Sequence, residues 1–544
     1  MKKNFIPEGV ADINYEEYEK MSAIETSVLD VFRRAGYRQI MTPTFEYYDL
    51  FSDGDIAVDT DDMYKIIDTN GKMMVLRPDA TVPIARMVAT HYKEDGGDIK
   101  LMYLTNVFRS ADYRAGGKRE FRQAGIEYFG TNSAEVDAGI ILTAIDALQK
   151  SGFHDLTTEI GNADYFNGFL EALASECGVN DDESEFRLRS MMESKNIPGL
   201  RQFCKDKNLP DKYAGVILEL PLMYGDIAEI TERAYEISVN EKMRAAVDNI
   251  KEISEKVGKS VSMTVDMSLI SSLDYYSGMI FRLYLKDSGA IIGSGGRYDG
   301  LMEKFGKNVP AAGFGLNIDL LYEVSQSEPV DEGVVNIALG KGRLADITVK
   351  KLAEAGIVFP EYTKESRKLI FTDSTGKYRI IFVKAVDVGI YVEKGACDVG
   401  IIGKDTLLES NSDVFEMLDL GYGKCIFAVA APKGYKYDTR KKLRVASKYP
   451  RVAKEFFAKS GRSIEVIKIN GSVELAPLVG LSDVIVDIVE TGNTLRENGL
   501  EIIEPITDIS ARFIVNRASL KIKRDQVMEL TRLMKEGTEK DEEN

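Results

Sequence analysis

An acidic strand end followed by a Thr-Gly-Asn-Thr turn occupies residues 484–495. The turn offers free backbone N–H groups and the hydroxyls of Thr491 and Thr494, which suit a phosphate group. The carboxylates of Asp487 and Glu490 could hold ribose hydroxyls or stabilise positive charge on a sugar ring. We therefore expect phosphate and ribose to bind here together, as in 5-phosphoribosyl-1-pyrophosphate. The alternative is a turn that binds nothing, since many Gly/Thr turns are purely structural.

The composition is that of an ordinary globular protein with several domains. The 544 residues are too many for one core and predict two to four domains, with 44% hydrophobic and 29% charged residues. No segment is long and apolar enough for a membrane span or a signal peptide, so we expect a cytoplasmic protein without a membrane partner. Four scattered cysteines without a Cys-x-x-Cys pair argue against disulfides and structural zinc.

The net charge and the small number of histidines argue against further classes of function. A net charge of −17 without a long basic run argues against a nucleic-acid partner. The only two histidines, His91 and His154, lie outside any motif, and we interpret them as surface or loop residues. We therefore expect neither a histidine base nor a protein-held metal site.

The first part of the chain has the pattern of an α+β domain, which we assign to residues 1–324. Apolar spacing predicts a helix over 14–35. Strands are expected at 73–76, 100–104, 121–129 and 278–285. Their irregular alternation with helices favours an antiparallel sheet. Residues 170–255 are charged and helix-prone, and they form an expected insertion.

A polar, Pro- and Gly-containing segment at 325–333 is the expected linker to a second domain over 334–544. In that domain, strands expected at 335–339, 369–371, 379–383 and 398–402 alternate with helices. This alternation predicts two α/β lobes, the second over about 431–505. The charged tail from about Lys535 is expected to fray.

An ordered set of motifs in 334–516 resembles the catalytic subunit of ATP phosphoribosyltransferase, the first enzyme of histidine biosynthesis. The motifs that carry the resemblance are Ile337-Ala-Leu-Gly-Lys-Gly-Arg-Leu344, Ser366-Arg-Lys-Leu-Ile-Phe371, Val383-Lys-Ala-Val-Asp387, Tyr391-Val-Glu-Lys-Gly-Ala-Cys-Asp-Val-Gly-Ile-Ile-Gly-Lys-Asp405, Asp419-Leu-Gly-Tyr-Gly-Lys-Cys425, Arg444-Val-Ala-Ser-Lys-Tyr-Pro450, Gly471-Ser-Val-Glu-Leu-Ala-Pro-Leu478 and the turn at 484–495. The resemblance implies a two-lobed fold similar to periplasmic binding proteins, with the active site in the cleft. It also implies transfer of a phosphoribosyl group to N1 of the ATP adenine, with Mg²⁺ present and pyrophosphate released.

The resemblance also suggests a role for each site residue. Asp487 and Glu490 would hold the ribose, and the 5-phosphate would lie on Thr491, Gly492, Asn493, Thr494 and Leu495. Cations and Mg²⁺ must neutralise the departing pyrophosphate. The cations that are candidates for this task, and for the ATP triphosphate, are Lys341, Arg343, Arg367 and Lys384, and Gly342 is a further candidate for substrate binding. For each single cation, a solvated surface side chain remains the alternative.

Two features depart from the family pattern. Family members usually have arginine where Lys384 stands and proline where Gly340 and Gly389 stand. Lysine keeps the charge but loses the bidentate fork, which would weaken the handling of pyrophosphate. The chain continues only by about one expected helix after Arg517. It therefore resembles the short form of the enzyme, which depends on a separate regulatory subunit.

Residues 5–322 resemble the core of histidine-tRNA synthetases, a class II family from which that regulatory subunit derives. The motifs that carry this resemblance are Phe32-Arg-Arg-Ala-Gly-Tyr37, Thr42-Pro-Thr-Phe-Glu46, Leu76-Arg-Pro-Asp-Ala-Thr-Val-Pro-Ile-Ala-Arg86, Val107-Phe-Arg109, Arg119-Glu-Phe-Arg-Gln-Ala-Gly-Ile-Glu127, Leu273-Asp-Tyr-Tyr-Ser-Gly278 and Gly293-Ser-Gly-Gly-Arg-Tyr-Asp-Gly-Leu301. Three replacements point to a lost synthetase activity. Ser110 follows Arg109 where an acidic residue is expected, and Ser271 and Leu320 stand where arginines are expected.

A lost ATP-activation site beside a retained amino-acid pocket is the pattern expected of a histidine sensor. The resemblance implies that Asp79, Thr81 and Gln123 hold the α-amino group and that Arg109 faces the carboxylate. Glu127, with Tyr275 or Tyr276, would pair with the imidazole nitrogens and so discriminate against other amino acids. The alternative is a scaffold with a vestigial pocket.

Taken together, the sequence predicts an ATP phosphoribosyltransferase with a histidine-binding regulatory domain fused in front, assembled as a homo-oligomer. The partners expected are ATP, phosphoribosyl pyrophosphate and histidine as inhibitor. Two rivals remain. The second domain could be a solute-binding protein, against which the missing signal peptide and the turn at 490–494 count. The first could still form histidyl adenylate, which Ser271 and Leu320 argue against.

Overall fold

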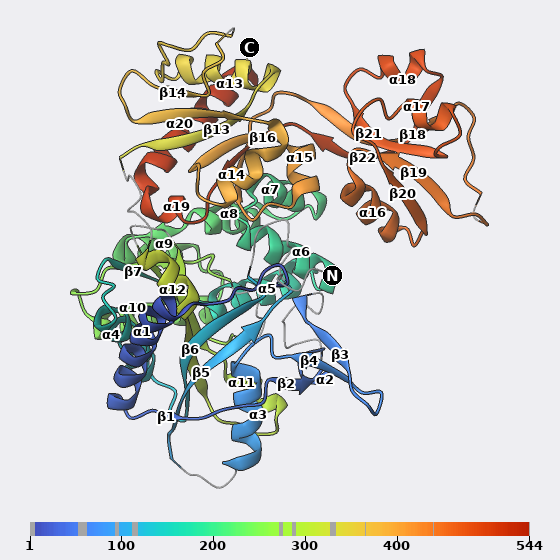
Figure 1. The fold of residues 1–544 in the computed structure, drawn as a ribbon. Helices are drawn as coiled ribbons and strands as arrows, with labels where there is room; N and C mark the ends of the chain where they lie inside the picture. Colours follow the sequence, from blue (N-terminus) through green and yellow to red (C-terminus); the bar gives the residue numbers. More distant parts are fainter. Residues whose placement is uncertain are drawn as a thin grey trace. The chain divides into compact units, whose positions relative to one another are not determined.

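The computed structural model describes residues 6–52, 62–92, 97–110, 118–270, 276–285, 290–326, 333–364, 366–438 and 440–542 (Figure 1). The chain divides into two compact units. The front unit holds Met1–Lys195 and Gly199–Val330, and the back unit holds Asn196–Pro198 and Asp331–Asn544. The division at Val330 lies inside the segment 325–333 that the sequence analysis marks as a linker.

A mostly antiparallel sheet forms the centre of the front unit (Figure 1). Its strands, in spatial order, are β1 (Arg38–Gln39), β5 (Ile99–Phe108), β6 (Glu120–Phe129), β12 (Ala311–Asn317), β11 (Ile291–Arg297), β10 (Met279–Leu285), β7 (Leu156–Asn162), β9 (Met263–Asp266) and β8 (Tyr224–Gly225). Only the β1–β5 and β7–β9 pairs among these are parallel. The expected α+β architecture of this unit is therefore confirmed.

Helices bury apolar side chains on both faces of this sheet. One face packs against α1 (Tyr15–Arg34), α4 (Ala134–Lys150) and α12 (Ile318–Ser325). The other packs against α2 (Asp49–Ser52), α3 (Thr81–His91) and α11 (Asp299–Lys304). A small sheet, β2 (Phe45–Tyr47), β4 (Met73–Leu76) and β3 (Lys65–Ile67), lies beside these elements.

Local sequence explains the bounds of α1. Asn14 and Glu17 form a capping box, in which each side chain accepts the other residue's backbone N–H. Met21, Val28 and Phe32 then recur at helical spacing and are buried. The predicted helix over 14–35 is thus observed over Tyr15–Arg34.

The expected insertion is helical. Its elements are α5 (Ala163–Cys177), α6 (Asp182–Glu193), α7 (Ile197–Asp206), α8 (Asp211–Glu219), the short η3 (Leu220–Leu222), α9 (Ile227–Ile237) and α10 (Glu241–Val257). Helices α5 and α10 pack onto the main sheet through the same apolar core as α1 and α4.

The back unit contains two sheets, each the centre of one α/β lobe. The first lobe has strands β14 (Ile370–Thr372), β15 (Tyr378–Val383), β13 (Val335–Gly340), β16 (Val399–Gly403), β23 (Ala511–Val515) and β17 (Phe415–Asp419) in spatial order. The second lobe has strands β20 (Ile464–Lys468), β19 (Leu443–Ser447), β21 (Val484–Val489), β18 (Cys425–Pro432) and β22 (Leu500–Ile509).

The helices of the first lobe are α13 (Arg343–Glu354), η4 (Ala385–Asp387), α14 (Val388–Glu393), α15 (Lys404–Ser410), α19 (Ser519–Ile522) and α20 (Arg524–Glu542). Those of the second lobe are α16 (Pro450–Lys459) on one face of its sheet, and α17 (Leu475–Leu478) and α18 (Asn493–Glu497) on the other. The chain passes from the first lobe to the second between β17 and β18, and it returns between β22 and β23.

Two sequence expectations need correction. The second lobe was expected over about 431–505, but its sheet extends from Cys425 to Ile509 because β18 and β22 pair along their whole length. The tail from Lys535 was expected to fray, but α20 continues to Glu542. An Arg532–Glu536 ion pair of 2.7 Å supports the turn of α20 that leads into this extension. No helix in the described part of the chain has both the length and the apolar character that a membrane span requires.

Candidate functional site

The predicted phosphate turn lies at the carboxyl end of β21. Gly492 adopts a φ of +70°, a left-handed conformation that favours glycine, and it precedes α18. Arg496 braces the turn, since its guanidinium donates a hydrogen bond of 3.0 Å to the carbonyl of Thr491 and another to the side chain of Asn493. Arg496, which belongs to α18, therefore holds the turn in one conformation.

A cavity of about 420 Å³ lies between this turn and the first lobe. Seven of the residues singled out in the sequence line it: Arg343, Asp487, Glu490, Thr491, Gly492, Thr494 and Leu495. Five do not belong to its lining: Lys341, Gly342, Arg367, Lys384 and Asn493. The cavity is thus formed by both lobes, with the phosphate turn on the second lobe and Arg343 on the first.

An ion pair joins the lobes across this cavity. The Arg343 guanidinium lies 2.9 Å from the carboxylate of Glu490, and both side chains are more than half exposed. An exposed pair of this kind contributes little to stability. A bound substrate could therefore replace either partner at small cost.

Asp487 is the most perturbed carboxyl group of the cavity. Burial, together with the neighbouring carboxylates Glu474 and Asp405, raises its pKa to about 6, although the N–H of Ile488 and the charge of Lys448 act to lower it. The Ile488 N–H donates a hydrogen bond of 2.8 Å to Asp487. A carboxyl group with a raised pKa in a cleft is a frequent property of functional sites.

The sequence analysis assigned no role to several lining residues. Asp405 and Glu474 lie in the quoted motifs, and together with Asp487 and Glu490 they make the cavity acidic. Asp405 accepts a hydrogen bond of 2.8 Å from the hydroxyl of Tyr449. Cys425 also lines the cavity, and burial raises the pKa of its thiol to about 11. The only signal for these residues in the sequence was their position inside the motifs.

Lys341 and Lys384 follow neighbouring parallel strands. Strands β13 and β15 pair with Gly340 opposite Val383, so both lysines stand at the carboxyl edge of the first-lobe sheet. The Lys341 N–H donates to the Val383 carbonyl at 3.3 Å. The structure therefore brings the backbones of these two lysines together, at the same edge of the sheet where α13 and Arg343 begin.

Arg367 precedes β14, which runs antiparallel to β15. The N–H of Phe382 donates to the carbonyl of Leu369, so the chain before β14 continues alongside the end of β15 toward Lys384. Arg367 is exposed. The third cation thus stands near the same edge as the two lysines.

The backbone explains one departure from the family pattern. A side chain at Gly340 would place its Cβ 2.7 Å from the Cα of Ala385, and one at Gly389 would lie 2.4 Å from the hydroxyl of Ser412. Both contacts are closer than real Cβ atoms make. In this backbone, therefore, glycine fits at both positions and proline does not.

In the front unit, three of the predicted side chains converge with one that was not predicted. Glu127 on β6 is 1% exposed and accepts a hydrogen bond of 2.7 Å from Thr81 and another from Tyr298. Burial and the nearby Asp79 raise the pKa of Glu127 to about 8, although these two hydrogen bonds act to lower it. The phenol that contacts Glu127 is thus Tyr298, in the quoted Gly-Gly-Arg-Tyr motif, a role the sequence analysis did not assign.

The other predicted pocket residues lie around this cluster. Asp79 is buried and accepts the N–H of Val82 at 3.0 Å, at the start of α3. Gln123 accepts a hydrogen bond of 3.2 Å from Tyr103. Arg109 donates to the carbonyl of Pro78 at 3.1 Å. Tyr276 packs against the same apolar core as Tyr103 and Tyr298, whereas Tyr275 and Ser271 lie outside the described residues.

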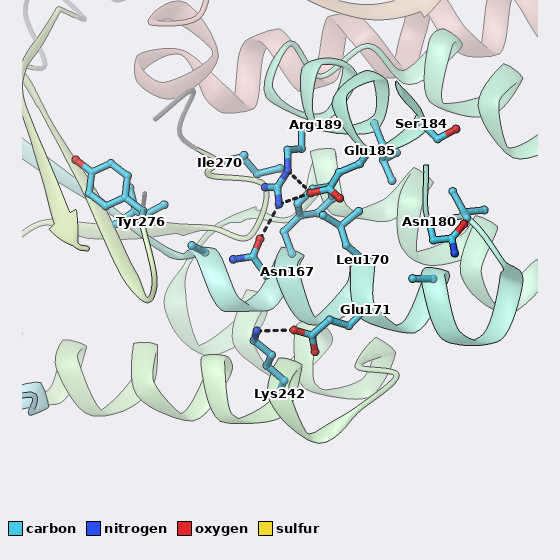
Figure 2. Close-up of a pocket in the computed structure, with 16 residues that line it drawn as sticks. Asn167, Leu170, Glu171, Asn180, Ser184, Glu185, Arg189, Lys242, Ile270 and Tyr276 are labelled. Atoms are coloured by element: carbon cyan, nitrogen blue, oxygen red, sulfur yellow. Dashed lines mark hydrogen bonds and ion pairs between the residues drawn. The ribbon is translucent and has the colours of Figure 1, made fainter. Parts of the chain in front are cut away.

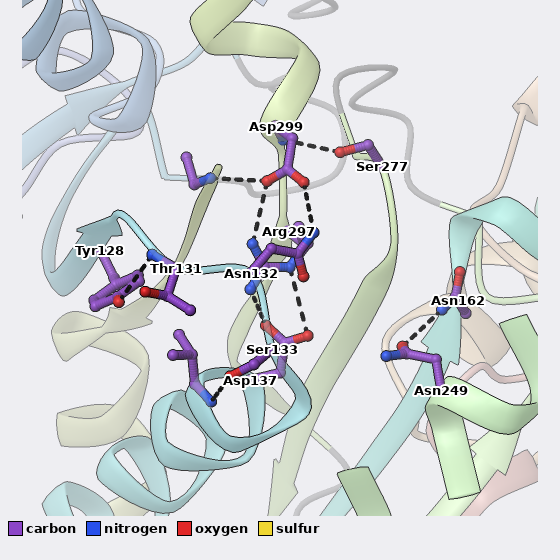
Figure 3. Close-up of polar contacts among 12 residues, drawn as sticks. Tyr128, Thr131, Asn132, Ser133, Asp137, Asn162, Asn249, Ser277, Arg297 and Asp299 are labelled. Atoms are coloured by element: carbon purple, nitrogen blue, oxygen red, sulfur yellow. Dashed lines mark hydrogen bonds and ion pairs between the residues drawn. The ribbon is translucent and has the colours of Figure 1, made fainter. Parts of the chain in front are cut away.

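A buried ion network fixes the strand end that carries Tyr298 (Figure 3). Arg297 on β11 pairs with Asp137 of α4 at 2.5 Å and with Asp299 at 3.2 Å. Asp299 also accepts the N–H of Ala311 at 2.8 Å. Because Tyr298 stands between two anchored residues, its hydroxyl is held toward Glu127.

Glycines on β12 make the space for Glu127. Gly313 lies directly opposite Glu127 in the β6–β12 pair, and a Cβ at Gly313 would lie 1.9 Å from a Glu127 carboxylate oxygen. We predict that Gly313→Ala lowers the free energy of unfolding by about 1–3 kcal/mol, because the methyl group must displace the buried carboxylate. Urea unfolding of the purified variant measures this change.

The matched control for that prediction is Gly139→Ala, in α4. A Cβ at exposed Gly139 meets no atom within 4 Å, so the substitution replaces a poor helix former without a clash. We expect it to leave stability unchanged or to raise it slightly. Equal stability of wild type and Gly313→Ala would show that Glu127 does not occupy the position described.

A second cavity, of about 450 Å³, lies within the helical insertion, with Tyr276 at one end (Figure 2). Two ion pairs line it. Arg189 contacts Glu185 at 2.9 Å and Asn167 at 3.0 Å, and Lys242 contacts Glu171 at 2.8 Å. Its charges are thus already paired within the insertion, and Tyr276 is the one residue of its lining that comes from a quoted sequence motif.

Two of the positions at which the synthetases carry a charged residue are described, and here they hold Leu320 and Ser110. Leu320 packs partly buried against the core of the front unit. The N–H of Ser110 donates to the carbonyl of Asp62 at 2.7 Å. Neither described position offers the charged group that the synthetase pattern places there.

Comparison with known proteins assigns each unit separately. Residues 9–321 match the family described as Histidyl-tRNA synthetase, and residues 384–536 match the family described as ATP phosphoribosyltransferase. The ATP phosphoribosyltransferase regulatory subunit of Acetivibrio thermocellus is 35% identical over 332 residues, which are 60% of this chain and 78% of that protein. The ATP phosphoribosyltransferase of Oceanobacillus iheyensis is 54% identical over 196 residues, 36% of this chain and 94% of that protein.

A solved structure also matches the front part. The crystal structure of an ATP phosphoribosyltransferase regulatory subunit/histidyl-tRNA synthetase from Bacillus halodurans C aligns with a TM-score of 0.54 and 28% identity. The alignment covers 70% of this chain and 93% of that structure. The antiparallel sheet of the front unit therefore has the fold of histidyl-tRNA synthetase-like proteins.

Proposed function

This chain belongs to the ATP phosphoribosyltransferase family in its back unit and to the histidyl-tRNA synthetase-like family of its regulatory subunits in its front unit, and we propose that the two units work as one feedback-regulated enzyme. The back unit condenses ATP with 5-phosphoribosyl-1-pyrophosphate to N1-(5-phosphoribosyl)-ATP and pyrophosphate. This is the first step of histidine biosynthesis.

The observation that carries the catalytic proposal is the cavity shared by the phosphate turn and Arg343. In the reaction, N1 of adenine attacks the ribosyl C1 while the bond from C1 to pyrophosphate breaks. Positive charge develops on the sugar, and Asp487 with Glu490 would stabilise it. The turn at 491–495 would hold the 5-phosphate, so that the ribose lies against both carboxylates.

Pyrophosphate leaves with negative charge that the first lobe would neutralise. Lys341 and Lys384 stand together at the end of β13 and β15, and Arg343 begins α13 beside them. Arg367 lies near the same edge of the first-lobe sheet. Each of these four cations would contact phosphate oxygens of ATP or of the leaving group, and release of the Arg343–Glu490 pair would free Arg343 for that contact.

Magnesium would enter as part of the pyrophosphate substrate. Mg²⁺ is usually held by substrate phosphates with one or two carboxylates and several waters. Within the described ranges, no group of three or more His, Cys, Asp and Glu residues forms a metal site by itself. The carboxylates of the cavity could supply the one or two protein ligands, and the metal would offset charge on the leaving group.

Asp487 should set the acid limb of the pH profile. Below its pKa of about 6 the group is protonated and neutral, and it cannot stabilise the ribosyl cation. We predict that kcat/KM for phosphoribosyl pyrophosphate rises with pH through about 6 and then levels. Because Glu474 raises that pKa, Glu474→Gln should move the limb to lower pH, and Asp487→Asn should abolish it. If the fall of kcat/KM at low pH remained in Asp487→Asn, it would have to arise from another group.

The front unit would bind histidine as the end-product inhibitor. Glu127 would accept an imidazole N–H at the cluster with Thr81 and Tyr298, and Tyr275 or Tyr276 would face the other ring nitrogen. Asp79, Thr81 and Gln123 would hold the α-amino group, and Arg109 the carboxylate. Histidine binding would favour an inactive arrangement, and linkage then requires ATP and phosphoribosyl pyrophosphate to weaken histidine binding equally.

Further features of the enzyme are proposed on the same basis. The two lobes, joined by two chain crossings around a cavity, support a periplasmic-binding-protein-like fold for the back unit. The four cysteines are free thiols, which supports a cytoplasmic enzyme. We also propose a homo-oligomer with small-molecule partners only, and the name of subunit that the relatives of the front unit carry supports an assembly.

The proposed reaction is tested by incubating the purified chain with ATP, phosphoribosyl pyrophosphate and Mg²⁺. We expect a product with the ultraviolet absorbance of an N1-substituted adenine and the mass of phosphoribosyl-ATP. Tight ATP binding without product would favour a binding protein instead. Histidine-dependent exchange of pyrophosphate into ATP would instead reveal a surviving synthetase activity.

A further inference from the structure

Helix α15 of the first lobe makes direct contacts with the second lobe beside the cavity. Asp405, at its start, accepts the hydrogen bond from Tyr449, which precedes α16. Leu408, one turn later, packs against the apolar core of the second lobe. These contacts join the lobes independently of the two chain crossings.

The strongest of these contacts involves the first turn of α16. This helix has no side-chain cap of its own, and its first residue, Pro450, has no N–H. The next two N–H groups, of Arg451 and Val452, donate to Glu409 of α15 at 2.9 and 3.2 Å. The following N–H, of Ala453, bonds back to Tyr449 within the helix. Glu409 therefore satisfies the open donors of a helix that belongs to the other lobe.

A short chain of contacts connects this cap with the reacting region. Tyr449 follows Ser447, the last residue of β19, and the Ser447 hydroxyl donates a hydrogen bond of 2.6 Å to the carbonyl of Val486. Val486 directly precedes Asp487 on β21. The position of α16 relative to α15 thus fixes where Asp487 lies with respect to the cations of the first lobe.

We propose that Glu409 is a positioning residue that holds the second lobe in the catalytic arrangement by capping α16 from the first lobe. The proposal rests on the proposed phosphoribosyl transfer and adds a residue outside its binding site. Glu409 carries a negative charge suited to a helix N-terminus, and the contact needs no substrate. Its effect should appear in the reacting geometry more than in substrate affinity.

Steady-state kinetics of Glu409→Ala, Glu409→Gln and wild type test this proposal. We expect kcat of Glu409→Ala to fall about 10- to 100-fold, since a displacement of about an ångström costs rate on that scale. KM for both substrates should change less than kcat. Glu409→Gln keeps an acceptor oxygen and should recover part of the loss.

Two control variants separate positioning from helix stability. Lys454→Gly weakens α16 through backbone freedom at an exposed position, and Glu455→Gln removes a carboxylate that pairs with Arg451 at 2.5 Å within the helix. Both should keep kcat near that of wild type. If kcat fell as far in Lys454→Gly as in Glu409→Ala, Glu409 would only stabilise α16, and the proposal would be wrong.

Hydrogen exchange gives a second readout that needs no turnover. The backbone N–H groups of Arg451 and Val452, which lose their acceptor, should exchange faster in Glu409→Ala than in wild type and should exchange as in wild type in Glu455→Gln. An inactive wild-type chain would refute the proposed reaction but leave this comparison valid. An active wild type with unchanged kcat in Glu409→Ala, or with unchanged exchange at Arg451 and Val452, would refute the role of Glu409.

Discussion

Replacing Asp487 and Glu490 together by Asn and Gln is expected to lower kcat for phosphoribosyl transfer about 10²- to 10³-fold, on the scale of losing one strong electrostatic contact in an active site. Both substitutions keep side-chain size and remove negative charge. The charge matters because the sugar becomes cationic as pyrophosphate leaves, and the cavity is already shielded enough to raise the pKa of Asp487 to about 6. Rapid-quench or steady-state measurement of pyrophosphate release gives the change.

The control for this double variant is Glu497→Gln, an exposed carboxylate on α18 that does not line the cavity. It should keep kcat near wild type and so exclude a general effect of net charge. The binding of phosphoribosyl pyrophosphate should weaken less than kcat falls, since the turn at 491–495 remains intact. Unchanged turnover in the double variant would refute the assignment of the ribose to these two carboxylates.

Glu127→Gln is expected to raise the histidine concentration for half-inhibition about 10- to 100-fold and to leave turnover without histidine unchanged. The reason applies above pH 8, where Glu127 is ionised: a hydrogen bond to a charged group contributes about 1.5–3 kcal/mol, whereas the amide offers a weaker acceptor to the imidazole, so the assays are run at that pH. The amide oxygen can accept one of the hydrogen bonds that Thr81 and Tyr298 donate to Glu127, and the amide NH2 can donate to the other hydroxyl, so the fold should be retained. Inhibition curves and calorimetric titration with histidine measure both quantities.

A matched variant is Glu135→Gln, which removes an exposed carboxylate of the same unit paired with Lys256. Its inhibition by histidine should equal that of wild type. If Glu127→Gln were inhibited like wild type, the histidine pocket would lie elsewhere in the chain. If it lost turnover without histidine, Glu127 would instead support the structure that activates the back unit.

Local patterns in the sequence were sufficient for the elements that carry the site. The buried strand before Asp487 and the turn at Gly492 were predicted because both depend on neighbouring residues only. The helix over Tyr15–Arg34 likewise follows from its capping box and its apolar spacing. The family resemblance then supplied the roles, which no local pattern contains.

The contacts between distant segments could not be predicted in this way. Glu409 and the first turn of α16 are about forty residues apart, and only the packing of two lobes brings them together. The sequence contained several tyrosines that could reach Glu127, and the strand register decided that Tyr298 contacts it. Asp405 and Glu474 had no distinguishing pattern, since their effect on Asp487 arises through space.

Histidine titration of pyrophosphate release by the purified single chain, with ATP, phosphoribosyl pyrophosphate and Mg²⁺, tests most directly that both functions reside in one polypeptide. The account predicts turnover without any added subunit and its progressive suppression by histidine. Turnover that histidine does not change would contradict the sensing role of the front unit. The absence of turnover, restored by adding a separate regulatory subunit, would contradict the claim that the fusion is self-sufficient.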